Sequence, residues 1–328
     1  MFEPEMKVAV EAVRKASALC QHVRATLVTD ETITKQDRSP VTIADLAAQA
    51  VMSQILLEAF PDDPLVAEED TALLQQEKHG DNRQRVFEQV RRILPGLDDA
   101  AILAAIDRGN HPGGASGRFW TMDPIDGTKG YIRGDQYAVA LALIEDGEVV
   151  LGVMGCPHLP QGTMNNTTAR GVIMAACRGG GAVSMPLEGE TATPLRVANA
   201  TRGDESVLCE SVEAAHTAHG RSAQIAARLG VHLDPVRIDS QCKYAIVARG
   251  EATTYLRLPR AGSTYEEKIW DHAAGVIVVT EAGGSVSDTR GAPLDFSLGR
   301  TLRNNTGVTA TNGALHAMVV DALAATQP

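Results

Sequence analysis

The amino-acid sequence predicts an α/β protein. The chain opens with amphipathic helical periodicity, and its middle holds apolar runs that turn back at short polar segments. From about residue 195, short apolar strands alternate with helical segments, which is the pattern of a sheet covered by helices. We therefore expect two regions: residues 1–194, with an antiparallel or mixed sheet and helices, and residues 195–328, with an α/β sheet.

In the first region, each element follows from its spacing or its boundaries. Apolar side chains three or four residues apart predict the first helix, and Thr42 is the expected N-cap of the second. Asp146-Gly147 between two apolar runs predicts a hairpin, and a strand that ends at residue 122 would place Asp123 at its carboxyl end. The predicted elements are helices at 13–27 and 43–59, a strand at 65–67, mostly helix at 71–110, and strands at 118–122, 137–144, 149–156 and 172–177.

In the second region, the predicted strands are shorter and the helices lie between them. This alternation favours a sheet with helices packed on it. The strands are expected at 206–209, 236–238, 253–258 and 307–311, and the helices at 216–229, 241–249, 269–282 and 314–325.

Composition limits the classes of function. A formal net charge of −11 disfavours a nucleic-acid partner, because such binding depends largely on Lys and Arg neutralising phosphates. The five cysteines form no CxxC pair, which favours a reducing compartment over a disulfide framework or a zinc site. The first residues lack the basic and apolar parts of a signal peptide, and no apolar run approaches 18 residues. We expect a cytoplasmic protein with no membrane partner.

The most informative stretch is Asp123-Pro-Ile-Asp-Gly-Thr128. Asp123 and Asp126 supply carboxylates and Ile125 a carbonyl, and hard cations such as Mg²⁺ prefer such oxygen ligands. Gly127 permits a tight turn, and a helix or turn that follows would direct the amides of Gly127 and Thr128 at an anion. The stretch indicates metal-dependent phosphate chemistry. An ordinary acidic turn is the alternative, since Asp, Pro and Gly are common turn residues.

Other acidic residues allow two interpretations each. Glu68, Glu69 and Asp70 follow a predicted strand and would complete a metal site with the Asp123 stretch, or they form a solvated acidic loop. Asp45 is either a general base near such a site or the third-position acid of a capping box that begins at Thr42.

Two further features lie in the second region. Asp271 is either the N-cap of a helix or a metal ligand delivered from this region, whereas His272 is expected to be buried or capping, because hard ions take oxygen ligands. Basic and polar side chains also gather here, and they would hold a second phosphate or form ordinary surface salt bridges. They are His216, Ser240, Lys243, Arg257, Arg260 and Lys268.

Together these motifs resemble the inositol monophosphatase superfamily, whose members are Mg²⁺-dependent, lithium-sensitive phosphatases. The resemblance rests on Glu68-Glu69, the Asp123 stretch and Trp270-Asp271. Longer strings resemble the 3′(2′),5′-bisphosphate nucleotidases within it: Ser39-Pro-Val-Thr-Ile-Ala-Asp45, Phe119-Trp-Thr-Met-Asp-Pro-Ile-Asp-Gly-Thr-Lys-Gly130, Asp239-Ser-Gln-Cys-Lys-Tyr244 and Glu267-Lys-Ile-Trp-Asp-His272. The resemblance covers nearly the whole chain and implies a layered fold of alternating helix and sheet, with the site between the two regions.

The resemblance also implies roles for individual residues. The implied ligands of two or three Mg²⁺ ions are Glu68, Asp123, the Ile125 carbonyl, Asp126 and Asp271. Asp45 and Thr128 match the pair that activates the attacking water. The expected substrate-binding residues are Gly127, Thr128, His216, Ser240, Lys243, Arg257 and Asp271.

The implied reaction is hydrolysis of the 3′-phosphate of adenosine 3′,5′-bisphosphate to AMP and phosphate, by in-line attack of an activated water. 3′-Phosphoadenosine 5′-phosphosulfate is a possible second substrate. The alternatives are an inositol or fructose phosphatase of the same superfamily, a phosphatase of the haloacid dehalogenase type, and a nucleotide sensor without turnover. The Asp-x-Asp motif of the dehalogenase type has one intervening residue, whereas Asp123 and Asp126 have two. The sequence leaves the oligomeric state open and is compatible with a monomer.

Overall fold

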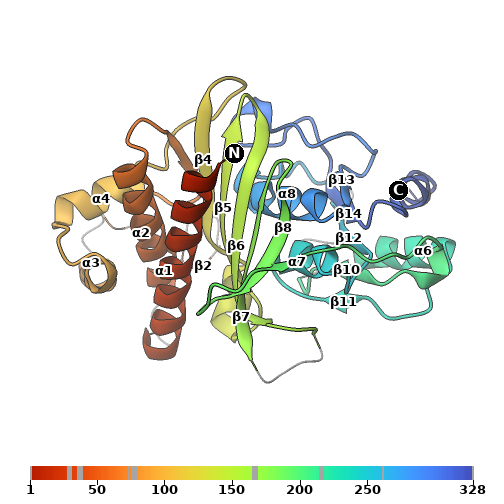
Figure 1. Cartoon of the computed structure of the whole chain (residues 1–328), viewed down its shortest axis with the longest axis horizontal. Coiled ribbons are helices and arrows are strands. Elements are labelled where there is room, and N and C mark those ends of the chain that lie inside the picture. Colours follow the sequence, from red (N-terminus) through yellow and green to blue (C-terminus); the bar gives the residue numbers. More distant parts are fainter. Residues whose placement is uncertain are drawn as a thin grey trace.

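The computed structural model describes residues 2–27, 32–34, 40–72, 74, 80–164, 169–213, 218–260 and 262–326. Helices and sheets alternate in layers across the molecule (Figure 1). A helical layer at the N-terminal side is followed by a large sheet, a pair of buried helices, a smaller sheet and an outer pair of helices. The α/β class expected from the sequence is confirmed.

The large sheet is built almost entirely from hairpins. Its strands, in spatial as well as sequence order, are β3 (Leu65–Ala67), β4 (Arg118–Asp126), β5 (Ala138–Glu145), β6 (Glu148–Pro160), β7 (Arg170–Cys177), β8 (Gly181–Pro186) and β9 (Thr193–Pro194). In the described part of this sheet, β3 and β4 are parallel and the other neighbouring strands are antiparallel. The hairpin predicted at Asp146-Gly147 is confirmed, and both residues have positive φ, as the twist of a two-residue hairpin turn requires.

Helices of the first part of the chain cover one face of this sheet. The apolar stripe predicted for the first helix is buried at Val13, Ala16, Cys20 and Val23, and it packs against β5, β6 and β7. The helices are α1 (Glu3–Leu27), α2 (Ile43–Ala59), α3 (Gly80–Ile93) and α4 (Asp99–Asp107), with a short strand pair β1 (Thr32–Thr34) and β2 (Pro40–Thr42) before α2 and the short helix α5 (Thr128–Arg133) after β4.

The smaller sheet is mixed. Its strands in spatial order are β11 (Val236–Arg237), β10 (Leu208–Glu210), β12 (Thr254–Arg257), β14 (Val308–Thr311) and β13 (Ser285–Ser287). β10 runs parallel to both of its neighbours, and β14 antiparallel to both of its own. The remaining elements are helices α6 (His219–Leu229), α7 (Cys242–Ala248), α8 (Ala273–Glu281) and α9 (His316–Ala324), and single 3₁₀ turns η2 (Gly203–Glu205), η3 (Ile269–Asp271) and η4 (Phe296–Leu298).

Helix α8 is the layer between the two sheets. It contacts β5, β6, β7 and β8 on one side and β13 and β14 on the other. Glycines allow the close approach: a Cβ on Gly152 of β6 would lie 2.5 Å from Ile277, and a Cβ on Gly275 would lie 2.2 Å from the ring of Tyr244 in α7. The core is therefore continuous from one sheet to the other.

Several elements differ from the sequence-based expectation. β4 does not end at residue 122 but runs through Asp126, with an irregular register between Asp123 and Asp126, where Pro124 cannot donate to the ladder. The helix expected at 269–282 is interrupted at His272, so that Asp271 lies in a 3₁₀ turn. Strands β1, β2, β8, β9 and β13 were not expected. The division at residues 194 and 195 stays a prediction.

Within the described part of the chain, no helix combines the length and the apolar composition that a bilayer span requires. All five cysteines are free thiols, four of them buried.

Candidate active site

The irregular end of β4 carries the stretch on which the functional hypothesis rests. Asp123 is 2% exposed and Ile125 is 1% exposed, whereas Asp126 is half-buried. Gly127 adopts a left-handed conformation (φ 88°) that starts α5, and the Thr128 hydroxyl donates to the Ile125 carbonyl at 3.2 Å. The bulge and the glycine turn therefore place two carboxylates and a carbonyl at the same end of the sheet.

Carboxylates from distant parts of the chain gather around Asp123. Burial raises the pKa of Asp123 well above its usual range, and the nearby negative charges of Glu68, Asp126, Asp271 and Asp45 raise it further. These groups come from α2, the segment after β3, β4 and η3. Asp45 and Asp123 are buried and Glu68, Asp126 and Asp271 are half-buried, and the four other carboxylates lie near enough to Asp123 to raise its pKa.

Asp126 also lies near positively charged side chains. Burial raises its pKa to about 6, even though Lys243, Arg257 and a hydrogen bond from the Gln241 amide at 2.5 Å lower it. Asp126 therefore stands between the acidic group and a basic one.

The acidic group fits a divalent cation. In the described part of the chain, the Oδ1 atom of Asp123 is buried and has no hydrogen-bond partner, although buried polar atoms are normally paired. Like charges this close are unfavourable unless a cation or protons neutralise them. Carboxylate and carbonyl oxygens are the ligands of Mg²⁺, so the donor set suits that ion better than a softer metal.

The basic side of the site is formed by α7 and the end of β12, the central strand of the smaller sheet, against which α7 packs. Lys243, 3% exposed in α7, donates to the Ile238 carbonyl at 3.4 Å, and its Nζ lies 5.3 Å from the centre of the Tyr255 ring. Burial lowers the pKa of Lys243, and Asp126 opposes that shift. Ser240, three residues earlier, is buried with φ at +63°, a rare conformation for a residue other than glycine. Because Lys243 is buried, the alternative that it forms an ordinary surface salt bridge is wrong.

Arg257 is fixed by a chain of buried polar groups. It contacts Glu267 at 2.7 Å and Asp271 at 3.4 Å. Glu267 also contacts the fully buried ring of His272 at 3.2 Å, and the other nitrogen of that ring contacts the Tyr244 hydroxyl at 2.7 Å. Burial would raise the pKa of Glu267, but Arg257 and His272 lower it to about 2. This series of contacts holds the Arg257 guanidinium and the Asp271 carboxylate in one geometry.

Among the described residues, one group of three potential metal ligands has an atom of each within 4.8 Å of the others, and it consists of Glu267, Asp271 and His272. Arg257 already pairs with Glu267, and both nitrogens of the His272 ring are occupied, one by Glu267 and the other by Tyr244. We interpret this trio as the support of Asp271. The expectation that His272 is buried is confirmed.

Most predicted site residues converge, with clear exceptions. His216 and the side chain of Thr42 lie outside the described residues, so the capping-box alternative for Asp45 cannot be compared with the structure. The N-cap alternative for Asp271 is wrong, because α8 begins at Ala273 and His272 occupies the N-cap position. Among the acidic neighbours of Glu68, Glu69 is buried and Asp70 is exposed.

Two residues that contact the site in the structure were assigned no role from the sequence. Gln241 donates its backbone amide to Asp126, and its side chain bonds to the Trp270 carbonyl at 3.0 Å and to the Gly275 amide at 3.0 Å. Glu267 is the second. Both residues lie inside sequence stretches that resemble the nucleotidases. The stretches gave no indication of what these two side chains contact.

Comparison with known proteins agrees with this geometry. Residues 1–327 match the inositol monophosphatase family. The chain is 43% identical to a 3′(2′),5′-bisphosphate nucleotidase of Schizosaccharomyces pombe, covering 99% of this chain and 96% of the relative. It is also 43% identical to a protein of the same name from Oryza sativa, covering 96% of this chain and 92% of the relative.

Solved structures show the same fold at lower sequence identity. The Thermotoga maritima IMPase superposes with a TM-score of 0.65 at 23% identity, covering 98% of this chain and 97% of that one. An inositol monophosphatase from Anabaena superposes with a TM-score of 0.62 at 21% identity, covering 98% and 96%. The match over nearly every residue, together with the layered fold, leads to one conclusion: the chain belongs to the inositol monophosphatase family.

Proposed function

We propose that the chain is a 3′(2′),5′-bisphosphate nucleotidase, a phosphomonoesterase that converts adenosine 3′,5′-bisphosphate to AMP and phosphate. The names of the relatives at about 40% identity support this function. The structure adds an acidic site next to buried cations. We infer 3′-phosphoadenosine 5′-phosphosulfate as a further substrate and the cytoplasm as the compartment, the latter on the five free thiols.

The single observation that carries the proposal is the position of Lys243 and Arg257. Both are largely buried, and both act on the charge of Asp126 within the acidic group. A substrate with one phosphate needs only the metal site, whereas a bisphosphate needs fixed cations for its second phosphate. Buried cations beside a metal site therefore favour a nucleotide bisphosphate over an inositol monophosphate.

We assign roles to the chain's residues as follows. Glu68, Asp123, the Ile125 carbonyl, Asp126 and Asp271 would hold Mg²⁺, which when bound polarises the phosphate and lowers the pKa of water. These five come from three separate stretches of the chain.

Proton transfer and substrate contacts fall to other groups. Asp45, 2% exposed at the start of α2, would take the proton from the attacking water. The Thr128 hydroxyl, held at the Ile125 carbonyl, would orient that water. The amides of Gly127 and Thr128 would contact the reacting phosphate, and Ser240, Lys243, Arg257 and His216 the rest of the nucleotide.

The substrate assignment is tested by phosphate release with Mg²⁺ present. We expect kcat/KM to be highest for adenosine 3′,5′-bisphosphate, lower for 3′-AMP, which lacks the second phosphate, and lowest for inositol 1-phosphate and fructose 1,6-bisphosphate. Lithium is expected to inhibit. Equal rates on inositol 1-phosphate would support the sister phosphatase instead, and a trapped phosphoenzyme would support the dehalogenase type.

The metal-site assignment is tested by Asp126→Asn. The amide keeps the shape of the side chain but loses the charge that faces the proposed ion, so we expect phosphate release to fall by about 10³-fold or more. Circular dichroism should show an unchanged fold. Retention of more than about a tenth of the activity would contradict the role of Asp126 in this site.

A further inference from the structure

Arg300 lies outside every motif considered so far, yet its side chain reaches the start of the acidic site. Its guanidinium donates to three backbone carbonyls, those of Ala67 at 2.5 Å, Gly109 at 2.9 Å and His111 at 3.1 Å. Ala67 is the last residue of β3 and directly precedes Glu68. Arg300 therefore fixes, across 233 residues of sequence, the backbone that presents Glu68.

The same guanidinium also holds the segment that presents Asp271. Its central carbon lies 4.8 Å from the centre of the Trp270 ring, a cation–π contact one residue before Asp271. The backbone next to Arg300 reinforces this contact, because the Ile269 amide donates to the Arg300 carbonyl at 3.2 Å. The Leu302 amide donates to the Glu267 carbonyl at 2.8 Å. Residues 300–302 and 267–269 thus lie side by side.

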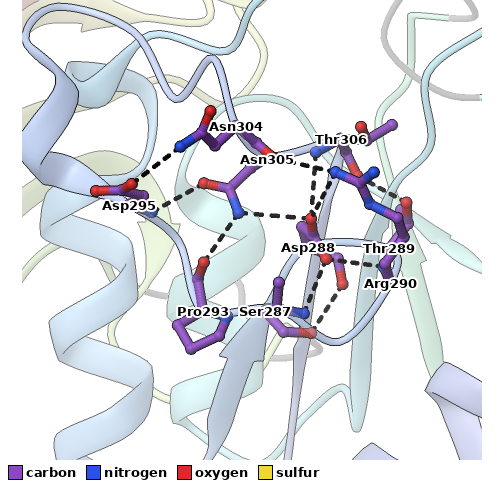
Figure 2. A network of polar contacts seen from close by, with 10 residues as sticks. Ser287, Asp288, Thr289, Arg290, Pro293, Asp295, Asn304, Asn305 and Thr306 are labelled. Carbon is purple, nitrogen blue, oxygen red and sulfur yellow. Dashed lines mark hydrogen bonds and ion pairs between the residues drawn. The ribbon is translucent and has the colours of Figure 1, made fainter.

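The loop that carries Arg300 is itself held at both ends. Figure 2 shows the network, in which the buried Asp288 carboxylate accepts from the amides of Arg290 at 2.8 Å and Thr306 at 3.4 Å. Asn305 donates to the Pro293 carbonyl at 2.9 Å and accepts from the Asp295 amide at 2.8 Å. Arg300 projects from a braced loop, so its contacts with β3 and Trp270 hold those segments in place.

We propose that Arg300 is a positioning residue that sets the separation of Glu68 and Asp271 and so tunes the affinity of the metal site. The inference rests on the proposed function only in that both use the same carboxylates. Arginine suits the task because its planar fork bonds several carbonyls while one face stacks on an aromatic ring. Lysine offers a point charge on a flexible stem and cannot do both.

The test measures binding of Mn²⁺ alone, with no substrate, by electron paramagnetic resonance of the free ion. Mn²⁺ takes the same carboxylate ligands as Mg²⁺. Arg300→Lys and Arg300→Gln are compared with Arg290→Lys as a matched control, because Arg290 contacts Asp288 and the Asn304 carbonyl in the same network. We expect both Arg300 variants to bind Mn²⁺ about 10- to 100-fold more weakly, which is typical when an outer contact of a metal site is lost.

The control should bind Mn²⁺ within about twofold of the unmodified chain. Melting temperatures of the metal-free proteins show whether a variant has merely lost stability. Unchanged Mn²⁺ affinity in either folded Arg300 variant, or equal weakening in Arg290→Lys, would overturn the proposal. The proposed nucleotidase activity stands apart, because the unmodified chain could fail to release phosphate from a bisphosphate while the Mn²⁺ result still holds.

Discussion

At the scale of single residues, burial and like charge are what separate Asp123 and Asp126 from an ordinary acidic turn. Both carboxyl groups have raised pKa values, and burial is the largest cause for each. Such groups are costly in the absence of a cation. The protein keeps this cost in the metal-free state, which is a sign that the site serves binding rather than stability.

The raised pKa of Asp126 gives a testable dependence of stability on pH. The folded carboxyl has a pKa of about 6 against an ordinary value of 3.8, so between these values the folded state holds a proton that the unfolded state has released. Stability of the metal-free protein should therefore fall as pH rises from about 4 to about 6. Thermal melts in EDTA across this range measure the slope.

Asp126→Asn is the control for this dependence. The variant lacks the titrating group, and we expect its melting temperature to fall less steeply over the same pH range. Asp123 and Asp271 still contribute in the same direction, because their pKa values are raised as well. An identical slope in the variant would show that Asp126 does not titrate as inferred.

The acidic residues of the candidate site could be predicted from the sequence, but the residues that hold them in place could not, and the reason is physical. A carboxylate that binds a hard cation needs a fixed residue type, so Glu68 and Asp123 stand out in short motifs. Arg300 contacts backbone carbonyls, which any residue supplies, and its partners lie as far as 233 positions away. No local pattern records such a contact.

At the scale of elements, the turn between β4 and α5 joins the two halves of the site. Gly127 lies against Ser240, and a Cβ on Gly127 would lie 2.9 Å from the Cβ of Ser240. Both residues have positive φ. The loop before α7 and the turn after β4 thus fit together only because one of them is glycine.

Gly127→Ala should damage both stability and activity. Alanine at positive φ costs about 1 kcal/mol, and the collision with Ser240 adds about 1–3 kcal/mol. Gly117→Ala is the matched control, since Gly117 has φ at 80° with open space around its Cβ. Urea unfolding and phosphate release measure the two effects.

We expect Gly117→Ala to lose only the smaller amount of stability and to keep its activity. Equal losses in the two glycine variants would indicate that the backbone conformation alone matters and that contact with Ser240 does not. A stable Gly127→Ala with full activity would contradict the close fit described here.

Element types were predictable from the sequence where periodicity was long, as in α1 and the β5–β6 hairpin. The end of β4 was not, because Pro124 and Gly127 read as a turn, whereas pairing with β5 carries the strand past the proline by a change of register. The interruption of the predicted helix at His272 was also missed, because tertiary contacts outside the local sequence cause it. Burial of that ring between Tyr244 and Glu267 outweighs the helical pattern around it.

At the scale of the whole molecule, α8 packs between the two sheets and contacts both. It packs on the large sheet through Gly152 and on α7 through Gly275, and in each case a side chain would not fit. Neither sheet can lose α8 without exposing apolar surface of its own. The predicted regions 1–194 and 195–328 are therefore expected to unfold together.

Differential scanning calorimetry checks this expectation. We predict one transition, with a calorimetric enthalpy equal to the van't Hoff enthalpy within error, for the metal-free chain. Gly152→Ala should shift that transition to lower temperature without splitting it, because it forces α8 away from β6. Two separate transitions would show that the regions are independent folding units.

The wide sequence spacing of the acidic cluster also affects how the protein is made. Asp45 and Asp271 are 226 positions apart, and Arg300 lies further still. During synthesis, the first helices and hairpins emerge long before Asp271 and Arg300. If the proposed ligands are correct, a nascent chain that has folded its large sheet lacks a complete cation site, and divalent ions cannot template that early stage.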